Sequence, residues 1–141
     1  MIAVISIGSC VILFTMVLAT VFFELASVVI DILTRHYAAS RQRIIALLAL
    51  LAAVVWIVLV LTLSVWSWAL VYFALGLFDH LEPALYFAIV SFTTVGYGDL
   101  VLEEEWRLLA GMTATNGLLV FGLFTAFLVD VMKEMRRIRR N

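Results

Sequence analysis

The sequence predicts an all-α membrane protein with three transmembrane helices and one short re-entrant helix. Hydrophobic residues occupy 66% of the 141 positions, against about 45–50% in soluble domains. Three apolar stretches, residues 2–30, 44–78 and 106–131, exceed the roughly 20 helical residues that cross a hydrocarbon core of about 30 Å. A fourth apolar segment at residues 84–92 is too short to cross. We therefore expect it to enter the membrane and return.

The basic residues predict how these helices are oriented. Eight of the nine lie between the first and second spans or after the third: Arg35, Arg41 and Arg43, then Lys133, Arg136, Arg137, Arg139 and Arg140. Lys and Arg accumulate in cytoplasmic segments. We therefore expect a multi-pass protein of the plasma membrane with its N-terminus outside and its C-terminus in the cytoplasm. The loop between spans two and three then faces outward, and it holds six of the ten acidic residues.

The first span and its linker make up residues 1–43. No basic residue precedes Arg35, which excludes a voltage-sensing helix with regularly spaced arginines. Glu24 and Asp31 are seven residues apart on one helical face, and Arg35 follows Asp31 at ion-pair spacing. Two interpretations stay open: an interfacial turn with local salt bridges, or a gating contact between one of these acids and a basic helix end.

Aromatic residues close the second span. Trp66, Trp68 and Tyr72 are predicted to form a belt at the outer membrane interface, where amphipathic rings gather. Glu82-Pro83 then marks the start of the short helix, because proline is favoured at the first helical position. The irregular backbone that follows, residues 94–98, must be buried in protein or line a water-filled cavity.

Residues 94–99 read Thr-Val-Gly-Tyr-Gly-Asp, a pattern suited to replacing the water shell of a cation with backbone carbonyl oxygens. Aiming successive carbonyls at one axis requires alternating backbone conformations, some with positive φ, which Gly96 and Gly98 adopt at little cost. Val95 and Tyr97 can then turn outward, and the Thr94 hydroxyl adds an oxygen. One chain supplies one wall of such a tube, so a complete ring requires several copies in cyclic symmetry.

This segment resembles the selectivity filter of potassium channels, in which four such loops surround the ion. The resemblance implies a homotetramer that conducts K+ passively, without enzyme activity, organic cofactor or nucleic-acid partner. It implies that the filter and its K+ ligands are Thr94, Val95, Gly96 and Tyr97, completed by Gly98 and Asp99.

The resemblance extends over residues 44–135. It implies an outer helix at 44–78, a pore helix at 83–93, the filter at 94–99 and an inner helix at 106–135, followed by a basic tail at 136–141. Gly117 and Gly122 take the positions of hinge glycines, and close helix packing is the alternative for both. The residues implied to face the conduction path are Leu118, Phe121, Thr125 and Val129. Three polar residues of this span are expected to bond neighbouring helices: Thr113, Thr115 and Asn116.

The pore helix departs from the family pattern in its side chains. Tyr86 and Phe87 stand where voltage-gated potassium channels commonly have two tryptophans. Val90 stands where some bacterial members have a glutamate paired to the filter aspartate. Asp99 therefore lacks that partner, and the Tyr86 hydroxyl is the candidate substitute.

Charges near both ends of the pore suggest further roles. The C-terminal end of the short helix points its partial negative charge at the membrane centre, where it favours a cation. Glu103, Glu104 and Glu105 either concentrate cations at the mouth or form a solvated loop. The basic run Lys133–Arg140 either anchors the topology or binds anionic lipids.

Two other classes of protein compete with a potassium channel. Gly96-Tyr97-Gly98-Asp99 contains the G-x-G-D signature of intramembrane aspartyl proteases, which need two carboxylates that share a proton. Asp31 and Asp130 are predicted at the opposite side of the membrane from Asp99, which disfavours this enzyme. The second alternative is a non-selective cation channel, or a pore subunit of a larger assembly.

Overall fold

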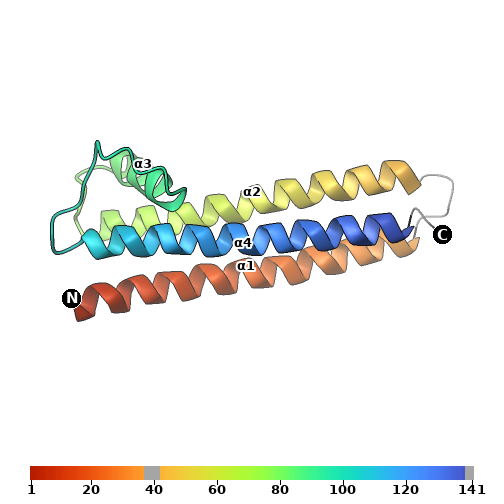
Figure 1. Cartoon of the computed structure of the whole chain (residues 1–141), viewed down its shortest axis with the longest axis horizontal. Helices are drawn as coiled ribbons and strands as arrows, with labels where there is room; N and C mark the ends of the chain where they lie inside the picture. The colour runs from red at the N-terminus through yellow and green to blue at the C-terminus, as the bar shows by residue number, and fades with distance from the viewer. Residues whose placement is uncertain (37–41, 139–141) are drawn as a thin grey trace.

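The computed structural model describes the backbone of residues 1–36 and 42–138, and side chains outside 29–46, 49 and 134–141. In this part of the chain every regular element is a helix: α1 (Ile2–His36), α2 (Gln42–Ala74), α3 (Leu81–Phe92) and α4 (Arg107–Ile138). The three long helices run side by side, and α3 lies across one end of them (Figure 1). We call this the α3 end. It also holds the N-terminus, whereas the C-terminal end of α4 lies at the opposite end.

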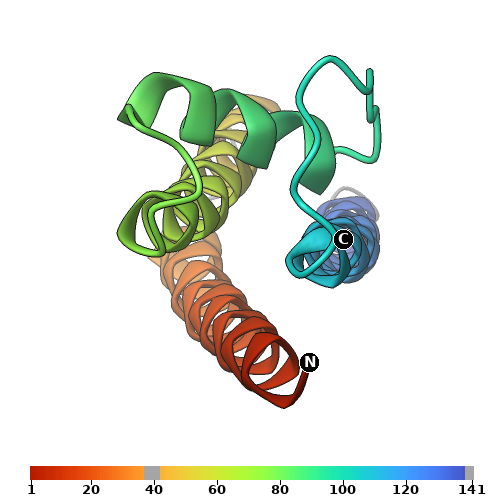
Figure 2. The ribbon, with the colours of Figure 1, turned by 90° about the vertical axis from the view of Figure 1, so that its left-hand side faces the viewer.

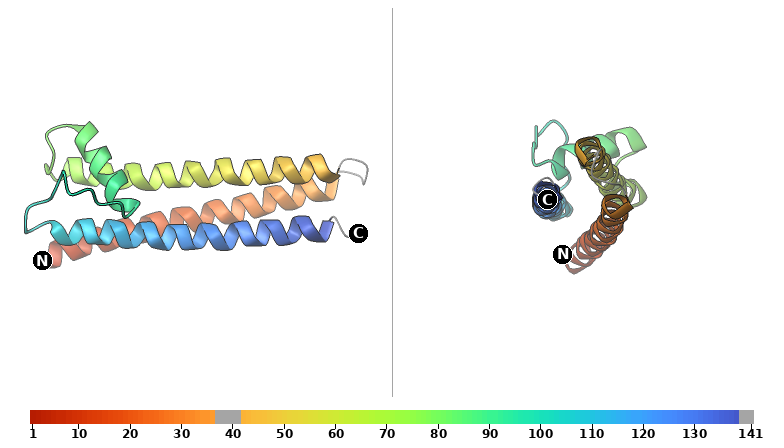
Figure 3. Two further views of the ribbon diagram at one scale, coloured as in Figure 1. Left: turned by 45° about the horizontal axis from the view of Figure 1, so that its top comes forward. Right: turned by 90° about the vertical axis from the view of Figure 1, so that its right-hand side faces the viewer.

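The predicted three spans are confirmed by the length and composition of the long helices. Ile2–Val28, Leu50–Ala74 and Arg107–Lys133 are each long and apolar enough to cross a membrane. The fold class, an all-α membrane protein, is therefore as the sequence predicts. In Figure 3 the short α3 runs obliquely from α2 toward α4. Its 12 residues span about 18 Å, too little to cross a bilayer.

Three helix boundaries differ from those expected. The short helix α3 begins at Leu81, so Pro83 is its third residue and not its first. The first helix continues without a break to His36, so residues 24–36 form no separate turn; the expected Asp31–Arg35 ion pair lies outside the described side chains. The second long helix ends at Ala74 rather than at residue 78. Gly76 adopts φ +69°, and its N–H donates to the carbonyl of Phe73 at 3.0 Å. This turn redirects the chain into α3.

The predicted aromatic belt on α2 is wrong for two of its three members. Trp68 and Tyr72 are fully buried within the chain, whereas Trp66 stays 39% exposed. The Tyr72 ring meets Phe87 of α3 edge-on with centroids 5.2 Å apart, and its hydroxyl is hydrogen-bonded to Thr113 of α4. Because α3 folds back over this face of α2, these rings pack in the protein core and not among lipid headgroups.

The first helix packs against both α2 and α4. Its position beside them is seen end-on in Figure 2. The Trp56 indole N–H of α2 donates to the carbonyl of Phe22 in α1 at 2.7 Å. The Phe23 ring stacks on Phe127 of α4 at 4.8 Å and meets Phe124 edge-on at 5.3 Å. The first span is therefore part of one helical bundle with the two helices that follow it.

A glycine brings the C-terminal end of α3 onto α4. A Cβ at Gly117 would overlap the carbonyl oxygen of Phe92 and lie 2.8 Å from its carbonyl carbon. The Phe92 ring also meets Phe121 at 6.0 Å. Gly122, the second predicted hinge glycine, has nothing within 4 Å of its own Cβ position. Close packing, the alternative to a hinge, thus explains Gly117 but not Gly122.

We expect Gly117→Ala to destabilise the protein by about 1–3 kcal/mol, the range for overpacking a tight contact. The new methyl group meets backbone, which cannot rotate away. Gly122→Ala is the matched control, because it adds the same methyl group on the same helix without a contact in the chain. Denaturant-induced unfolding in detergent micelles measures the difference. Equal stability of the two variants would show that the α3–α4 contact is looser than described.

Candidate functional site

The segment that follows α3 is tied back to that helix through its N–H groups. The N–H of Val95 donates to the carbonyl of Val90 at 3.0 Å, and that of Gly96 donates to the same oxygen at 3.3 Å. Thr94 donates to Ser91 at 3.0 Å. In the part of the chain that the structure describes, no carbonyl oxygen of residues 94–97 accepts a backbone hydrogen bond. The first three N–H groups of the segment are therefore occupied, and its carbonyl oxygens are free of described backbone bonds.

The backbone φ angle of this segment is positive at every second residue. Thr94 has φ +62°, Gly96 has φ +55° and Gly98 has φ +78°. In an ordinary strand, successive carbonyl groups point to opposite sides. Positive φ at every second residue lets them point to the same side, which is the condition for aiming several carbonyl oxygens at one axis. The sequence pointed to both glycines but missed Thr94. A non-glycine residue rarely adopts this conformation, so the surrounding structure must hold Thr94 in it.

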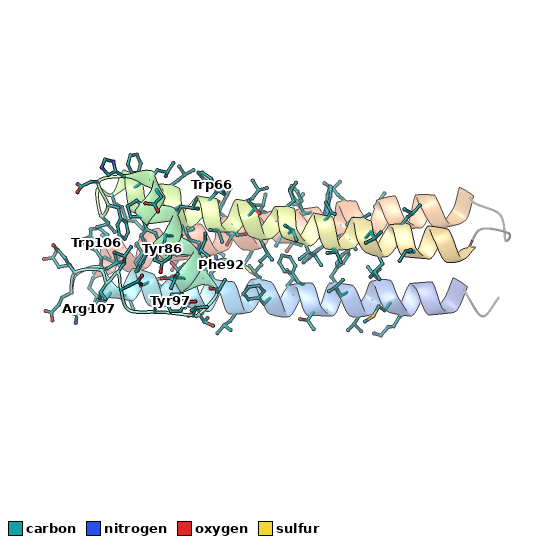
Figure 4. All side chains as sticks on the ribbon, turned by 90° about the horizontal axis from the view of Figure 1, so that it is seen from above. Trp66, Tyr86, Phe92, Tyr97, Trp106 and Arg107 are labelled. Atoms are coloured by element: carbon teal, nitrogen blue, oxygen red, sulfur yellow. The ribbon has the colours of Figure 1, made fainter. Side chains whose placement is uncertain are left out.

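Two large side chains of the segment are uncovered in the single chain. Val95 is 52% exposed and Tyr97 is 73% exposed. Figure 4 shows Tyr97 at the α3 end with Tyr86, Phe92 and Trp106. Such apolar and aromatic groups need a cover of lipid or of further protein. A single chain in this structure leaves them uncovered.

The Asp99 carboxylate has the partner proposed for it from the sequence. The Tyr86 hydroxyl donates to Asp99 Oδ2 at 2.6 Å, and the N–H of Leu100 donates to Oδ1 at 3.1 Å. The hydrogen bond from Tyr86 holds the pKa of Asp99 below its ordinary value. This confirms Tyr86 as the residue of α3 that anchors the end of the segment.

The other acidic residues near the site are exposed. Glu103, Glu104 and Glu105 lie in the loop before α4. Arg107 approaches Glu104 at 3.4 Å, with both side chains more than half exposed. Exposed pairs of this kind contribute little to stability. The structure leaves open both predicted roles of these acids.

One face of α4 is uncovered along much of its length. Of the residues expected to face a conduction path, Leu118, Thr125 and Val129 are exposed, whereas Phe121 is half-buried against Phe92. The predicted hinge glycine Gly122 is exposed at the same helical spacing. Gly111 and Thr115 are exposed on the same face and were not expected there. Their spacing of three and seven residues from Leu118 could have predicted that they share its helical face.

The polar residues of α4 divide between its two faces. Thr113 and Asn116 are fully buried and bond Tyr72 of α2 and Thr15 of α1, as the sequence predicts. Thr115 instead donates to the carbonyl of Gly111 in its own helix at 2.9 Å. Its hydroxyl therefore needs no partner from another helix.

The geometry disfavours a paired-carboxylate enzyme. Asp99 lies just before α4, and Asp130 lies near the other end of that helix, where Lys133 binds it at 3.1 Å. From residue 107 to residue 130 an α-helix rises about 35 Å, so the two carboxylates cannot share a proton. Asp31 lies outside the described side chains.

Comparison with known proteins assigns the family. A profile described as Ion channel matches residues 44–134, which covers α2, α3, the segment 94–99 and most of α4. The chain belongs to the ion channel family. It is also 41% identical, over 61 residues, to the protein named "Two pore potassium channel a" of Oryza sativa subsp. japonica. That alignment covers 43% of this chain and 18% of the relative, and no solved structure matches the chain significantly.

These findings support a channel rather than an enzyme and bear out the resemblance to potassium channel pores. The matched region begins after α1, so the first helix is an addition to the part that the family shares. Residues 94–98, whose irregular backbone was expected to be buried in protein or to line a water-filled cavity, lie within the matched region of this channel.

We expect Tyr86→Phe to raise the pKa of Asp99 toward its ordinary value. The lost hydrogen bond stabilises the carboxylate over the carboxylic acid, so it contributes above the ordinary pKa and disappears as the pH falls through the lowered one. NMR titration of the Asp99 carboxyl carbon in micelles measures the shift. Tyr97→Phe is the control, because its hydroxyl makes no bond to Asp99 in the described structure. An unchanged pKa in the Tyr86 variant would contradict the contact.

Proposed function

We propose that this channel conducts K+ selectively, as a homotetramer, through a filter formed by residues 94–99. The observation that carries the proposal is the positive φ at Thr94, Gly96 and Gly98, combined with carbonyl oxygens that accept no described backbone bond. Four such segments around one axis would present rings of carbonyl oxygens from residues 94–97, able to replace the hydration shell of K+. The similarity to a protein named as a potassium channel supports the choice of ion.

The tetramer accounts for the surfaces that one chain leaves open. Neighbouring subunits would cover Val95 and Tyr97, which are more than half exposed. The uncovered face of α4 would then line the path below the filter with Leu118, Gly122, Thr125 and Val129. Because Gly117 holds the α3 contact, we place any bend of the inner helix at Gly122.

We further propose that the channel lies in the plasma membrane with the α3 end outside. The basic groups at the other end of the bundle support this orientation. Lys133 is exposed there and paired with Asp130, and the remaining residues of the run Lys133–Arg140 lie outside the described side chains. A bilayer rich in anionic lipid is the partner that fits this end.

The alternative is a cation channel of relaxed selectivity, or a pore subunit that needs other chains. Reversal potentials in K+ and Na+ gradients separate these options once the purified chain is reconstituted in planar bilayers. A reversal potential that follows the K+ gradient supports the proposal. Equal response to both ions supports relaxed selectivity, and silence of the pure chain with conduction in a mixed assembly supports the subunit.

We expect Gly98→Ala to abolish K+-selective current. An L side chain at φ +78° costs roughly 1–2 kcal/mol, and the backbone relieves that strain by rotating its carbonyl groups out of the ring. Gly76→Ala is the matched control, since Gly76 has φ +69° and both glycines have nothing within 4 Å of the added Cβ.

The two glycine variants therefore carry similar strain at different places. Single-channel recording in bilayers should show selective current for Gly76→Ala and none for Gly98→Ala. Selective current from both variants would mean that the backbone of residue 98 does not shape the ion path.

A further inference from the structure

The first helix makes a buried polar contact with α4 that the shared pore region does not include. Thr15 of α1 and Asn116 of α4 are both fully buried. The Asn116 side-chain amide donates to Thr15 Oγ1 at 2.8 Å. Elsewhere along this pair of helices the described contacts are apolar, such as Gly8 against Met112 and Phe23 against Phe127. One directional bond thus fixes how α1 and α4 sit along each other.

The hydroxyl of Thr15 can accept this bond and still donate to a carbonyl of its own helix. It lies 2.9 Å from the carbonyl of Ile12 and 3.0 Å from that of Val11. A hydroxyl has one hydrogen to donate and two lone pairs that accept. Donating to α1 leaves a lone pair for the Asn116 N–H, and Asn116 Oδ1 also lies 3.1 Å from the same hydroxyl. The Thr15 hydroxyl is therefore satisfied where it cannot reach water. Losing the hydroxyl would leave a buried amide unpaired, which is costly.

This bond meets α4 at the level where the other helices also hold it. Tyr72 of α2 bonds Thr113, Thr15 of α1 bonds Asn116, and Phe92 of α3 rests on Gly117. The three contacts lie within five residues of α4. Thr94, where the positive-φ segment begins, is two residues beyond Phe92. A shift of α4 at this level therefore moves the support of the filter.

We propose that α1 is a filter-positioning helix, and that the Thr15–Asn116 bond fixes α4 where it supports the end of α3 and the first residue of the filter. The inference rests on the proposed K+ conduction and adds to it a role for the helix outside the shared pore region. Thr15 and Asn116 touch no ion in this scheme. They act through the contact between Gly117 and Phe92.

The test is the ratio of K+ to Na+ permeability of Thr15→Val, measured from reversal potentials of the full chain in planar bilayers. We expect the ratio to fall by about threefold or more, in line with the strength of interhelical hydrogen bonds in membranes. A permeability ratio does not depend on how many channels fold. A loss of folded protein alone would lower the current and leave the ratio unchanged.

Two controls are built into α1. Thr15→Ser keeps the hydroxyl and should keep the wild-type ratio. Thr20→Val makes the same chemical change at an exposed threonine of α1, which donates only within its own helix, to Met16 at 2.8 Å, and it should also keep the ratio. A fall in all three variants, or in none, would overturn the proposal.

A further variant covers the case in which Thr15→Val does not assemble. Thr15→Val combined with Asn116→Leu leaves no buried polar group unpaired, so it should assemble. It still lacks the directional bond, and we expect its ratio to stay reduced. A wild-type ratio in this double variant would overturn the positioning role.

Failure of the proposed function gives a different result. If the wild-type chain shows no preference for K+, the proposed K+ selectivity itself is wrong. If the wild type is selective and the Thr15 and Asn116 variants match it, only the role of α1 is wrong.

Discussion

The proposed filter depends on a backbone whose carbonyl oxygens, in residues 94–97, accept no described backbone hydrogen bond. Unpaired peptide groups are costly away from water, so this segment is stable only if its other groups are satisfied and its oxygens meet an ion or water. For the first three residues the chain meets the first condition by returning the N–H groups of Thr94, Val95 and Gly96 to the last turn of α3. The same bonds hold Thr94 at positive φ. The short helix is thus both the support and the hydrogen-bond partner of the segment.

That support in turn needs a fixed base, which α4 provides over residues 113–117. Glycine at 117 lets backbone meet backbone, an approach that any larger residue would prevent. Buried hydrogen bonds from two other helices meet the same stretch. Further along the helix, a Cβ at Gly122 would meet no described atom within 4 Å. Two glycines five residues apart therefore have different surroundings, and Gly122 is the one at which we propose that the helix bends.

The sequence predicted the features that depend on short-range chemistry. The lengths of the spans follow from the thickness of the hydrocarbon core, and positive φ at Gly96 and Gly98 follows from their missing Cβ. The Tyr86–Asp99 bond was expected from the positions of the two residues in a sequence that resembles a potassium channel pore. It failed where the outcome depends on tertiary packing. Trp68 and Tyr72 have the composition of an interfacial belt, and only the return of α3 over α2 buries them. Positive φ at Thr94 is imposed by bonds to α3, which no propensity of threonine reveals.

The composition of the uncovered surfaces fits the proposed assignment of α1 and α2 to lipid and of one face of α4 to the pore. Exposed residues of α1 and α2 are mostly large and apolar, such as Leu13, Phe14, Val55 and Val58, which suits acyl chains. The uncovered face of α4 includes Gly111, Thr115, Gly122 and Thr125. Both threonine hydroxyls bond their own helix, at 2.9 Å to the carbonyls of Gly111 and Phe121, and a lone pair of each stays available. Such a face can border water without requiring a fixed partner.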